Sequence, residues 1–537
     1  MKRKAAERDR ILDAAWIFLA VIVLGLVIAI RVRLLGIPLE RDEGEYAYAG
    51  QLMLQGIPPY MLAYNMKFPG TYAAYALIMA IFGQTIVGIH LGLLLINAAT
   101  ILLIFLLGRR LIDSIAGIAA AMTCAVLSVS PSVFGFAAHA THFVMLPTLG
   151  GILLLLTESD ERNFGRLFVS GLLFGTSLLM KQPAAFFILF GALYLLSNDL
   201  RRKCGWKRIV SRNLTFDLGA IVPFGIATLF LWRAGVVDKF WFWTINYARE
   251  YSSLIPLGMA ARLFSKTALG VISSTWLLWT LAALGVIAGL WNKRMRSSAV
   301  FLVGFLAFSL AAFSAGFYFR EHYYIFVLPA ASLFTGVAIS ALPNLTARHS
   351  NFVRFALLLL FCVALSQPIL AARKFYFEVS PVEASRMVYG PNPFPESVRL
   401  AEYLRDHTEA GDTIAVLGSE PQIYFYSKRH SATGYIYTYG LMELQAYARQ
   451  MQEEMIRQIE SARPKYVIVV VVPNSWLRHP ESESLILTWT DQYIKTHYRV
   501  VGLANIVSSD RTDYYFEQMP ESVPQLGTYV LIYQRKS

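Results

Sequence analysis

The stretch ILDAAWIFLAVIVLGLVIAI, Ile11–Ile30, is a run of twenty predominantly apolar residues near the N-terminus. As a helix rising 1.5 Å per residue, it is long enough to cross the hydrocarbon core of a bilayer. Five of residues 1–10 are Lys or Arg, and Arg31 and Arg33 follow the run. A signal peptide has a shorter apolar core and a small-residue cleavage site. We therefore expect an uncleaved first span with its N-terminus in the cytoplasm.

Ten further apolar segments give a prediction of eleven spans. They lie at 86–107, 114–134, 143–157, 167–180, 183–197, 214–233, 268–290, 298–316, 324–341 and 354–372. With a cytoplasmic N-terminus, the inner loops hold 20 Lys and Arg in 61 residues, against 10 in 106 residues of the outer loops. This bias has the direction that the positive-inside rule requires. We expect an all-α polytopic membrane domain over residues 1–372.

The composition supports this class of protein and excludes others. The chain has 537 residues, of which 56% are hydrophobic and only 15% charged, which argues against a soluble globule or a disordered chain. Its net charge is +13, but residues 373–537 carry −2 and residues 1–372 carry +15. The positive charge thus lies among the apolar segments, where it indicates topology and not a nucleic-acid partner.

One apolar segment does not fit the count of spans. Thr71–Gly83 has thirteen residues, which is short for a span. Counting it as one would reverse the sides of all later loops. We interpret it as an interfacial or re-entrant helix within the first outer loop, 31–85.

The tail, 373–537, has the pattern of a soluble α/β domain on the outer side of the membrane. Helices alternate with strands, which favours a partly parallel sheet in three layers. The predicted helices are Ser397–His407, Leu441–Ala462 and Leu485–Lys495, and the predicted strands are Thr413–Leu417, Tyr466–Val472, Tyr498–Ile506 and Tyr529–Gln534.

The first outer loop carries the most informative residues. Glu40-Arg41-Asp42-Glu43-Gly44-Glu45-Tyr46 holds four of the sixteen acidic residues of the membrane half. Asp42 and Glu45 have the spacing of a helix capping box. A group of carboxylates at an interface also needs a cation, a metal or a polar substrate, and Arg41 and Lys67 are the nearby cations. A cap and a catalytic carboxylate at the membrane surface both explain Asp42.

The loop also resembles a known family. The motifs are Arg41 to Tyr48 (RDEGEYAY), Gln55 to Tyr60 (QGIPPY) and Lys67 to Tyr72 (KFPGTY). They are similar to the first outer loop of GT-C membrane glycosyltransferases of the ArnT and protein mannosyltransferase group. That resemblance implies a GT-C fold over about 10–370 and a donor sugar on a polyprenyl phosphate.

The resemblance also implies roles for individual residues. It makes Asp42 the catalytic base, with Glu43 beside it as the second catalytic candidate, and Lys67 a contact to the donor phosphate. Glu45 and Tyr46, in the same turn, are further candidate substrate contacts. The family has an acid in the second outer loop where this chain has His142, which cannot supply a fixed negative charge.

Later outer loops add cationic and aromatic candidates. Lys181 and Arg320 are candidates to bind the donor phosphate. The ammonium of Lys181 is a point charge, and the guanidinium of Arg320 can donate two parallel hydrogen bonds to phosphate oxygens. His142, His322 and Tyr323 are candidate substrate contacts. A snorkelling role for Lys181 and a salt bridge to Glu321 for Arg320 are the structural alternatives. The aromatic run from Phe240 to Trp243 is expected to form an interfacial belt.

Together these features predict an inverting glycosyltransferase of the inner cell membrane that needs no cofactor or metal. Its partners would be the polyprenyl-phosphate-linked sugar donor, membrane lipids and a glycan, lipid or protein acceptor on the outer face. The sequence has no P-loop and no dinucleotide fingerprint. A transporter or flippase of a polyprenyl-linked glycan is one alternative, and a non-catalytic anchor that presents the tail is another.

Overall fold

The computed structural model describes residues 2–157, 163–293, 295–345, 351–520 and 526–536. It has two compact units, each built from separated parts of the chain. Unit 1 combines Met1–Leu34, His90–Ala227 and Ile255–Glu378, and unit 2 combines Leu35–Ile89, Thr228–Leu254 and Val379–Ser537. Parts of two predicted outer loops therefore fold with the tail. The linear division into 1–372 and 373–537 stays a prediction.

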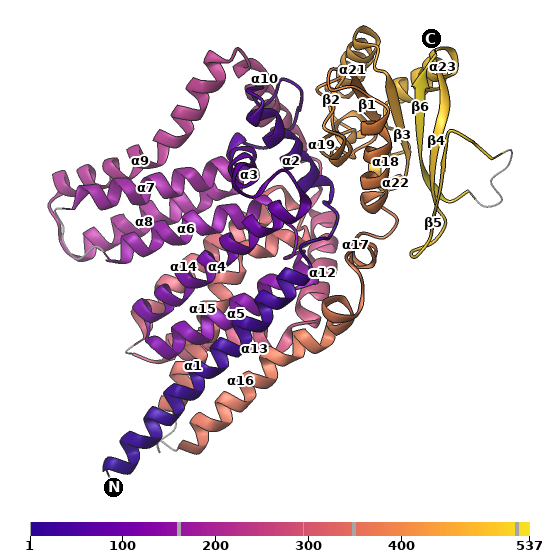
Figure 1. Cartoon of the computed structure of the whole chain (residues 1–537). Coiled ribbons are helices and arrows are strands. Elements are labelled where there is room, and N and C mark those ends of the chain that lie inside the picture. The colour runs from indigo at the N-terminus through magenta and orange to yellow at the C-terminus, as the bar shows by residue number, and fades with distance from the viewer. Residues whose placement is uncertain (1, 158–162, 294, 346–350, 521–525, 537) are drawn as a thin grey trace. The chain divides into compact units, whose positions relative to one another are not determined.

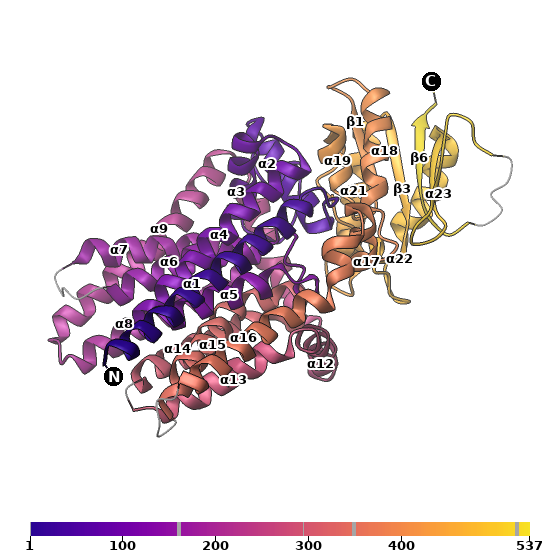
Figure 2. The same cartoon turned by 60° about the horizontal axis from the view of Figure 1, so that its bottom comes forward.

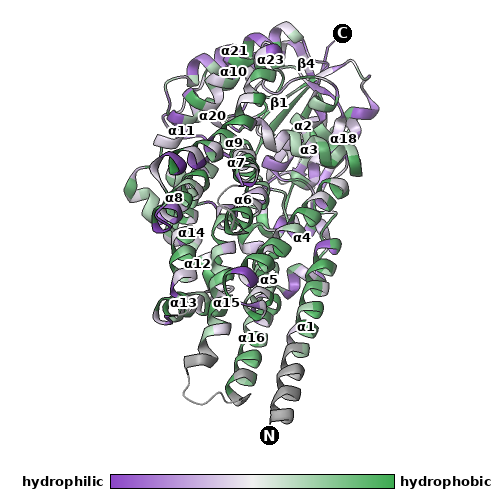
Figure 3. Ribbon diagram, turned by 90° about the vertical axis from the view of Figure 1, so that its left-hand side faces the viewer, coloured by the Kyte–Doolittle hydropathy of each residue, from purple (hydrophilic) through white to green (hydrophobic). Residues whose placement is uncertain are grey.

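Unit 1 is helical throughout the described residues (Figure 1). Its helices, two of which extend into unit 2, are α1 (Lys2–Arg33), α4 (Ile86–Leu111), α5 (Ser114–Val129), α6 (Ala140–Thr157), α7 (Phe164–Met180), α8 (Ala185–Arg201), α9 (Trp206–Arg233), α12 (Leu257–Ser273), α13 (Trp276–Trp291), α14 (Arg296–Ser314), α15 (Leu328–Leu345) and α16 (Asn351–Ala371). Short 3-10 helices lie between some of them, at η1 (Pro131–Val133), η2 (Gln182–Ala184), η4 (Ala315–Phe317) and η5 (Glu321–Phe326), and the π-helical η6 (Lys374–Glu378) follows α16. Hydrophobic residues run along most of these helices (Figure 3).

The lengths of these helices fit a multi-pass membrane protein. Five single segments among the described residues are long and apolar enough to cross a bilayer: Ala14–Arg33, Ile86–Leu111, Gln182–Arg201, Trp206–Arg233 and Arg296–Phe317. The other six predicted spans coincide with shorter apolar helices: Ser114–Val129, Ala140–Leu156, Phe164–Met180, Trp276–Trp291, Leu328–Ala341 and Phe355–Ala371. Every predicted span thus contains an apolar helix, and the number that crosses the membrane stays a prediction.

Close helix packing explains part of the small-residue content of unit 1. Helices α5, α15 and α13 lie side by side (Figures 1 and 2). A Cβ atom on Gly285 of α13 would lie 1.8 Å from the carbonyl oxygen of Phe334 in α15. Only glycine allows this approach, as is typical of helix interfaces in membranes.

The predicted span 268–290 is wrong at its N-terminal end. The chain ends α12 at Ser273 and begins α13 at Trp276. The hydroxyl of Thr275 donates to the carbonyl of Val271 (2.8 Å) and accepts from the indole nitrogen of Trp279 (3.0 Å). Hydroxyl residues at this point compete for the backbone groups and favour a break that hydropathy does not register.

In its described residues, unit 2 contains a mixed sheet of six strands, as the sequence partly predicts. The strands are β1 (Thr413–Leu417), β2 (His430–Ser431), β3 (Tyr466–Val471), β4 (Tyr498–Ile506), β5 (Thr512–Phe516) and β6 (Thr528–Arg535). Their order is β2-β1-β3-β6-β4-β5, in which β1 pairs parallel with β2 and β3 and the other pairs are antiparallel. The two strands that the sequence misses, β2 and β5, lie at the edges.

Helices complete unit 2. They are α2 (Arg41–Leu54), α3 (Pro69–Phe82), α10 (Val237–Trp241), the π-helical η3 (Phe242–Tyr247), α11 (Ala248–Ser253), α17 (Pro381–Tyr389), α18 (Phe394–Asp406), α19 (Gln422–Ser427), α20 (Tyr439–Met442), α21 (Ala448–Ala462), α22 (Pro473–Trp476) and α23 (Leu485–His497). The predicted helix Leu441–Ala462 is interrupted between α20 and α21, where the Gln445 amide donates to the carbonyl of Gly440 (2.7 Å). The short apolar segment after Lys67 forms α3, which packs against α2.

The sheet of unit 2 has helices on both faces. Ala415 and Val467 share a buried core with residues of α21 and α23. On the opposite face, Tyr466 contacts Tyr403 of α18, with ring centroids 6.4 Å apart. The prediction of three layers is therefore confirmed for this part of the chain.

We expected the aromatic run 240–243 to form an interfacial belt, but most of its side chains are not exposed as a belt requires. Trp243 belongs to the hydrophobic core of unit 2, and so does Tyr247 in the same segment. Phe240 is also buried, whereas Trp241 is 53% exposed. The alternation arises because a helical turn presents only one side to the core, which composition alone does not reveal.

Candidate functional site

The first turn of α2 places the carboxylates that the sequence singled out. The N-cap is Glu40, whose side chain accepts a hydrogen bond from the backbone N–H of Glu43 (3.0 Å). The Glu43 carboxylate accepts in return from the N–H of Glu40 (3.3 Å). This is a complete capping box. The alternative of Asp42 as the cap with Glu45 as its partner is therefore wrong, because both capping positions lie two residues earlier.

Lys67 lies between two carboxylates of α2. Its ammonium donates to Asp42 Oδ1 (2.8 Å) and to Glu45 Oε2 (2.7 Å). The side chains of Asp42 and Lys67 are 18% and 15% exposed, and that of Glu45 is fully buried. Tyr72 donates its hydroxyl to Glu45 Oε1 (2.5 Å), and the ammonium lies 4.6 Å from the ring centre of Tyr46. Four residues expected at the site, Asp42, Glu45, Tyr46 and Lys67, are thus in contact.

Burial and pairing shift the acid–base properties of this group. Burial raises the pKa of Glu45, and the neighbouring Lys67 partly opposes the shift. Burial lowers the pKa of Lys67, but Asp42 and Glu45 outweigh it and hold that pKa well above its ordinary value. The ammonium of Lys67 therefore stays charged at physiological pH.

Glu40 supports a prediction about stability against pH. Burial, followed by the charges of Asp42 and Glu43, raises the pKa of Glu40 from 4.5 to about 8. Between these values the folded chain holds a proton that the unfolded chain releases, so rising pH favours unfolding. We expect the Glu40→Gln variant, which keeps the capping oxygen and cannot ionise, to flatten the fall of the melting temperature between pH 5 and 8. Identical slopes for variant and wild type would contradict this assignment.

The tail contributes a residue that sequence reasoning missed. The hydroxyl of Tyr437 donates to Asp42 Oδ1 (2.8 Å), and Lys67 lies 5.5 Å from the centre of the Tyr437 ring. The only signal in the sequence is a local density of tyrosine, with Tyr435, Tyr437 and Tyr439 within five residues. Nothing in that pattern connects it to a loop almost 400 residues earlier.

A glycine in the acidic motif, Gly44, allows the tail to approach α2 closely. A Cβ atom on Gly44 would lie 2.7 Å from the backbone nitrogen of Gln422, the first residue of α19. Any larger side chain would push α2 and α19 apart. The motif thus needs glycine for packing and carboxylates for chemistry.

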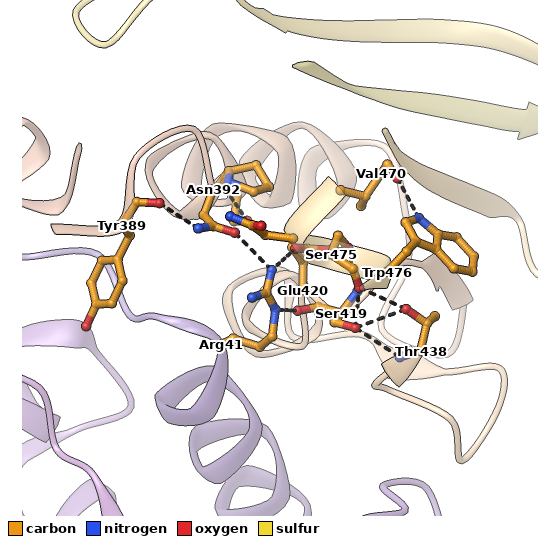
Figure 4. A network of polar contacts seen from close by, with 12 residues as sticks. Arg41, Tyr389, Asn392, Ser419, Glu420, Thr438, Val470, Ser475 and Trp476 are labelled. Carbon is orange, nitrogen blue, oxygen red and sulfur yellow. Dashed lines mark hydrogen bonds and ion pairs between the residues drawn. The ribbon is translucent and has the colours of Figure 1, made fainter. Parts of the chain in front are cut away.

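Arg41, the second candidate cation, turns away from the acidic cluster. Its guanidinium donates to Glu420 Oε1 (2.7 Å) and to Asn392 Oδ1 (3.2 Å), as Figure 4 shows. Both partners belong to the tail. Arg41 therefore binds the tail, and Lys67 alone of the two neutralises Asp42 and Glu45.

The other predicted site residues belong to unit 1. Lys181 lies 4.3 Å from the ring centre of Tyr323. His322 stacks on His139 with ring centroids 4.1 Å apart, and His142 is buried. Arg320 precedes η5 and lies 5.6 Å from the ring centre of Tyr318. That these residues share one pocket with Asp42 and Lys67 stays a prediction.

We compared the chain with known protein families and with curated protein sequences. The family model of dolichyl-phosphate-mannose-protein mannosyltransferases matches residues 67–230. A search of curated protein sequences finds no match.

Solved structures match over nearly the whole chain. ArnT from Cupriavidus metallidurans bound to undecaprenyl phosphate has a TM-score of 0.62 at 16% identity, with 95% of this chain and 99% of that chain covered. The Archaeoglobus fulgidus oligosaccharyltransferase in its apo form has a TM-score of 0.53 at 12% identity, covering 93% and 74%. AglB from the same organism, in complex with an inhibitory peptide and a dolichol-phosphate, has a TM-score of 0.50 at 13% identity, covering 94% and 75%. The chain has the GT-C fold.

Proposed function

We propose that the chain is an integral-membrane glycosyltransferase that moves a sugar from a polyprenyl-phosphate donor to a hydroxyl acceptor. The observation that carries this is the Asp42 carboxylate, partly exposed and held by Lys67 and Tyr437 in a GT-C fold. Two proteins of similar fold have been solved with a polyprenyl phosphate. In this proposal the N-terminus is cytoplasmic and the acidic turn faces the outer side, as the distribution of Lys and Arg indicates.

The reaction would be a single displacement. The acceptor hydroxyl attacks the anomeric carbon, Asp42 takes the hydroxyl proton, and the bond between that carbon and the phosphate oxygen breaks. The polyprenyl phosphate leaves with the electron pair, and the anomeric centre inverts. Glu43 would support this geometry through its capping box, while Glu45 and Tyr46 would line the substrate side.

The leaving group needs positive charge in a fixed position. Lys67 is the first candidate because it is charged and partly exposed beside Asp42. We propose Arg320 and Lys181 as further phosphate ligands, and His142, His322 and Tyr323 as substrate contacts. Fixed cations of this kind stabilise charge that develops on a departing phosphate.

A turnover assay tests the function without knowledge of the acceptor's identity. The full-length protein in sealed liposomes is given synthetic undecaprenyl-phosphoryl hexoses and pentoses, together with an extract of cell-envelope glycans, lipids and proteins. We expect release of undecaprenyl phosphate and transfer of the sugar from at least one donor. Movement of an intact donor between leaflets without release would favour the transporter instead, and no reaction with any donor would overturn the proposal.

A further inference from the structure

The edge of the tail sheet where parallel strands end holds a residue from the first outer loop. Strands β1 and β3 are parallel neighbours that end at Leu417 and Val471. Ser419 and Glu420 follow β1, and Ser475 follows β3. In open α/β sheets a ligand commonly binds beyond the carboxyl ends of such strands. Here Arg41 of α2 occupies that position.

Arg41 is bound there by several groups at once (Figure 4). Its Nε donates to the backbone carbonyl of Ser419, and its terminal nitrogen donates to Glu420 and Asn392. The guanidinium also lies 5.4 Å from the ring centres of Phe394 and Tyr439. Arg41 is 8% exposed and Glu420 is fully buried, so the pair is shielded from solvent.

The same network fixes the segment of the tail that reaches the candidate base. Glu420 Oε2 accepts from the hydroxyl of Ser475 (2.6 Å). The carbonyl of Ser475 accepts from the hydroxyls of Ser419 (2.6 Å) and Thr438 (3.0 Å). The N–H of Thr438 in turn donates to Ser419 Oγ (3.0 Å). Thr438 is thereby tied through both its backbone and its side chain.

Thr438 stands between the two tyrosines that contact α2. Tyr437 donates to Asp42, and Tyr439 packs on Arg41. Two successive residues of α2, Arg41 and Asp42, are thus contacted by the two tyrosines that flank Thr438. A buried ion pair adds little net stability, and its best-attested effect is to fix one arrangement among several.

We propose that the tail completes the active site. Tyr437 is a positioning residue for Asp42, and the Arg41–Glu420 ion pair fixes the position of the first turn of α2, which carries Asp42. This inference rests on the proposed function and assigns the tail a part in catalysis. Without the Tyr437 hydroxyl, the Asp42 carboxylate loses a hydrogen bond that fixes its Oδ1 atom and keeps the one from Lys67. The acceptor hydroxyl would then meet a base with more rotational freedom.

The first test compares two phenylalanine variants of the same segment. Tyr437→Phe removes the hydrogen bond to Asp42, and Tyr435→Phe removes one to Glu454, which lies outside the network around Arg41 and Asp42. Both are assayed with the undecaprenyl-phosphoryl sugar that wild type consumes fastest. We expect kcat of Tyr437→Phe to fall about tenfold or more with the KM for the donor unchanged within about twofold, and Tyr435→Phe to match wild type. Equal kcat values for Tyr437→Phe and wild type would overturn the inference.

The second test removes the ion pair without leaving a buried charge. We expect Arg41→Met combined with Glu420→Met to keep the melting temperature near that of wild type, because apolar replacement of both partners of a buried pair is often neutral. Its kcat should nevertheless fall about tenfold. If the double variant melts at a clearly lower temperature than wild type, the Glu420→Gln variant is measured instead. We expect its kcat to fall as well, and a kcat equal to that of wild type would contradict the role of the pair.

Hydrogen exchange supplies a readout that does not depend on activity. In the full-length double variant, amide protection over 39–46 should fall relative to wild type while protection of β3 is retained. Unchanged protection and unchanged kcat would overturn the role of the pair. If the wild-type protein consumes no donor at all, the proposed function is wrong. If the wild-type protein is active and the variants are equally active, only the inference about the tail is wrong.

Discussion

Asp42→Asn is expected to lower the rate of sugar transfer by at least about 10³-fold, because it removes the only proposed acceptor for the hydroxyl proton. The substitution keeps an oxygen where Lys67 and Tyr437 donate, so those two contacts can persist. The melting temperature should therefore change little. The measurement is the initial rate of undecaprenyl phosphate release from the donor, with the same variant's binding of undecaprenyl phosphate as a check on the fold.

Glu43→Gln is the matched control for that variant. Glu43 carries the neighbouring carboxylate, but its side chain serves the capping box of α2, and glutamine can take the same role. We expect this variant to retain transfer within a few-fold of wild type. An active Asp42→Asn protein, or an inactive Glu43→Gln protein that still melts normally, would move the proton acceptor away from Asp42.

Hydropathy and charge were enough to predict most of the helical unit, because burial in a bilayer leaves a long and simple pattern. Every predicted span contains an apolar helix. The errors arose where a local polar group decides the outcome, as at Thr275, whose hydroxyl contacts separate α12 from α13. Hydropathy averages over such single contacts.

The tail shows the same contrast. Strands Thr413–Leu417 and Tyr498–Ile506 match their predicted bounds, because each is a run rich in β-formers bounded by turns or helices. The edge strand His430–Ser431 is too short to leave a periodic pattern. At the break between α20 and α21 the amide of Gln445 donates to the carbonyl of Gly440, a contact that no periodicity indicates.

The candidate site was predictable only where its residues are neighbours in sequence. Clustering of acids identified the turn at Asp42 and Lys67 as a nearby cation, and the resemblance to a family added the role of Lys67 as a phosphate contact. Tyr437 and Glu420 could not be found in this way, since they reach α2 only through the folding of the tail. Long-range contacts of this kind depend on the whole fold and not on any local pattern.

Lys67→Met should affect both stability and transfer. It would leave Glu45, whose side chain is fully buried, and Asp42 without their shared cation. Breaking a buried pair on one side costs about 3–5 kcal/mol, so we expect the melting temperature to fall by several degrees. Transfer should fall about 10²–10³-fold through loss of charge at the leaving phosphate. Lys239→Met is the control, because Lys239 pairs with Glu454 (2.6 Å) on a more exposed surface, with side chains 40% and 26% exposed, and should matter little.

A double variant separates the two effects of Lys67. Lys67→Met leaves the buried Glu45 carboxylate without a counter-ion. Adding Glu45→Gln removes that charge, so the melting temperature should recover much of its loss. Transfer should not recover, because the neutral amide introduced in place of the Glu45 carboxylate offers no positive charge to the donor phosphate. Recovery of both would show that Lys67 acts only as the counter-ion of Glu45, and recovery of neither would mean that Asp42 is the carboxylate that most needs the ammonium.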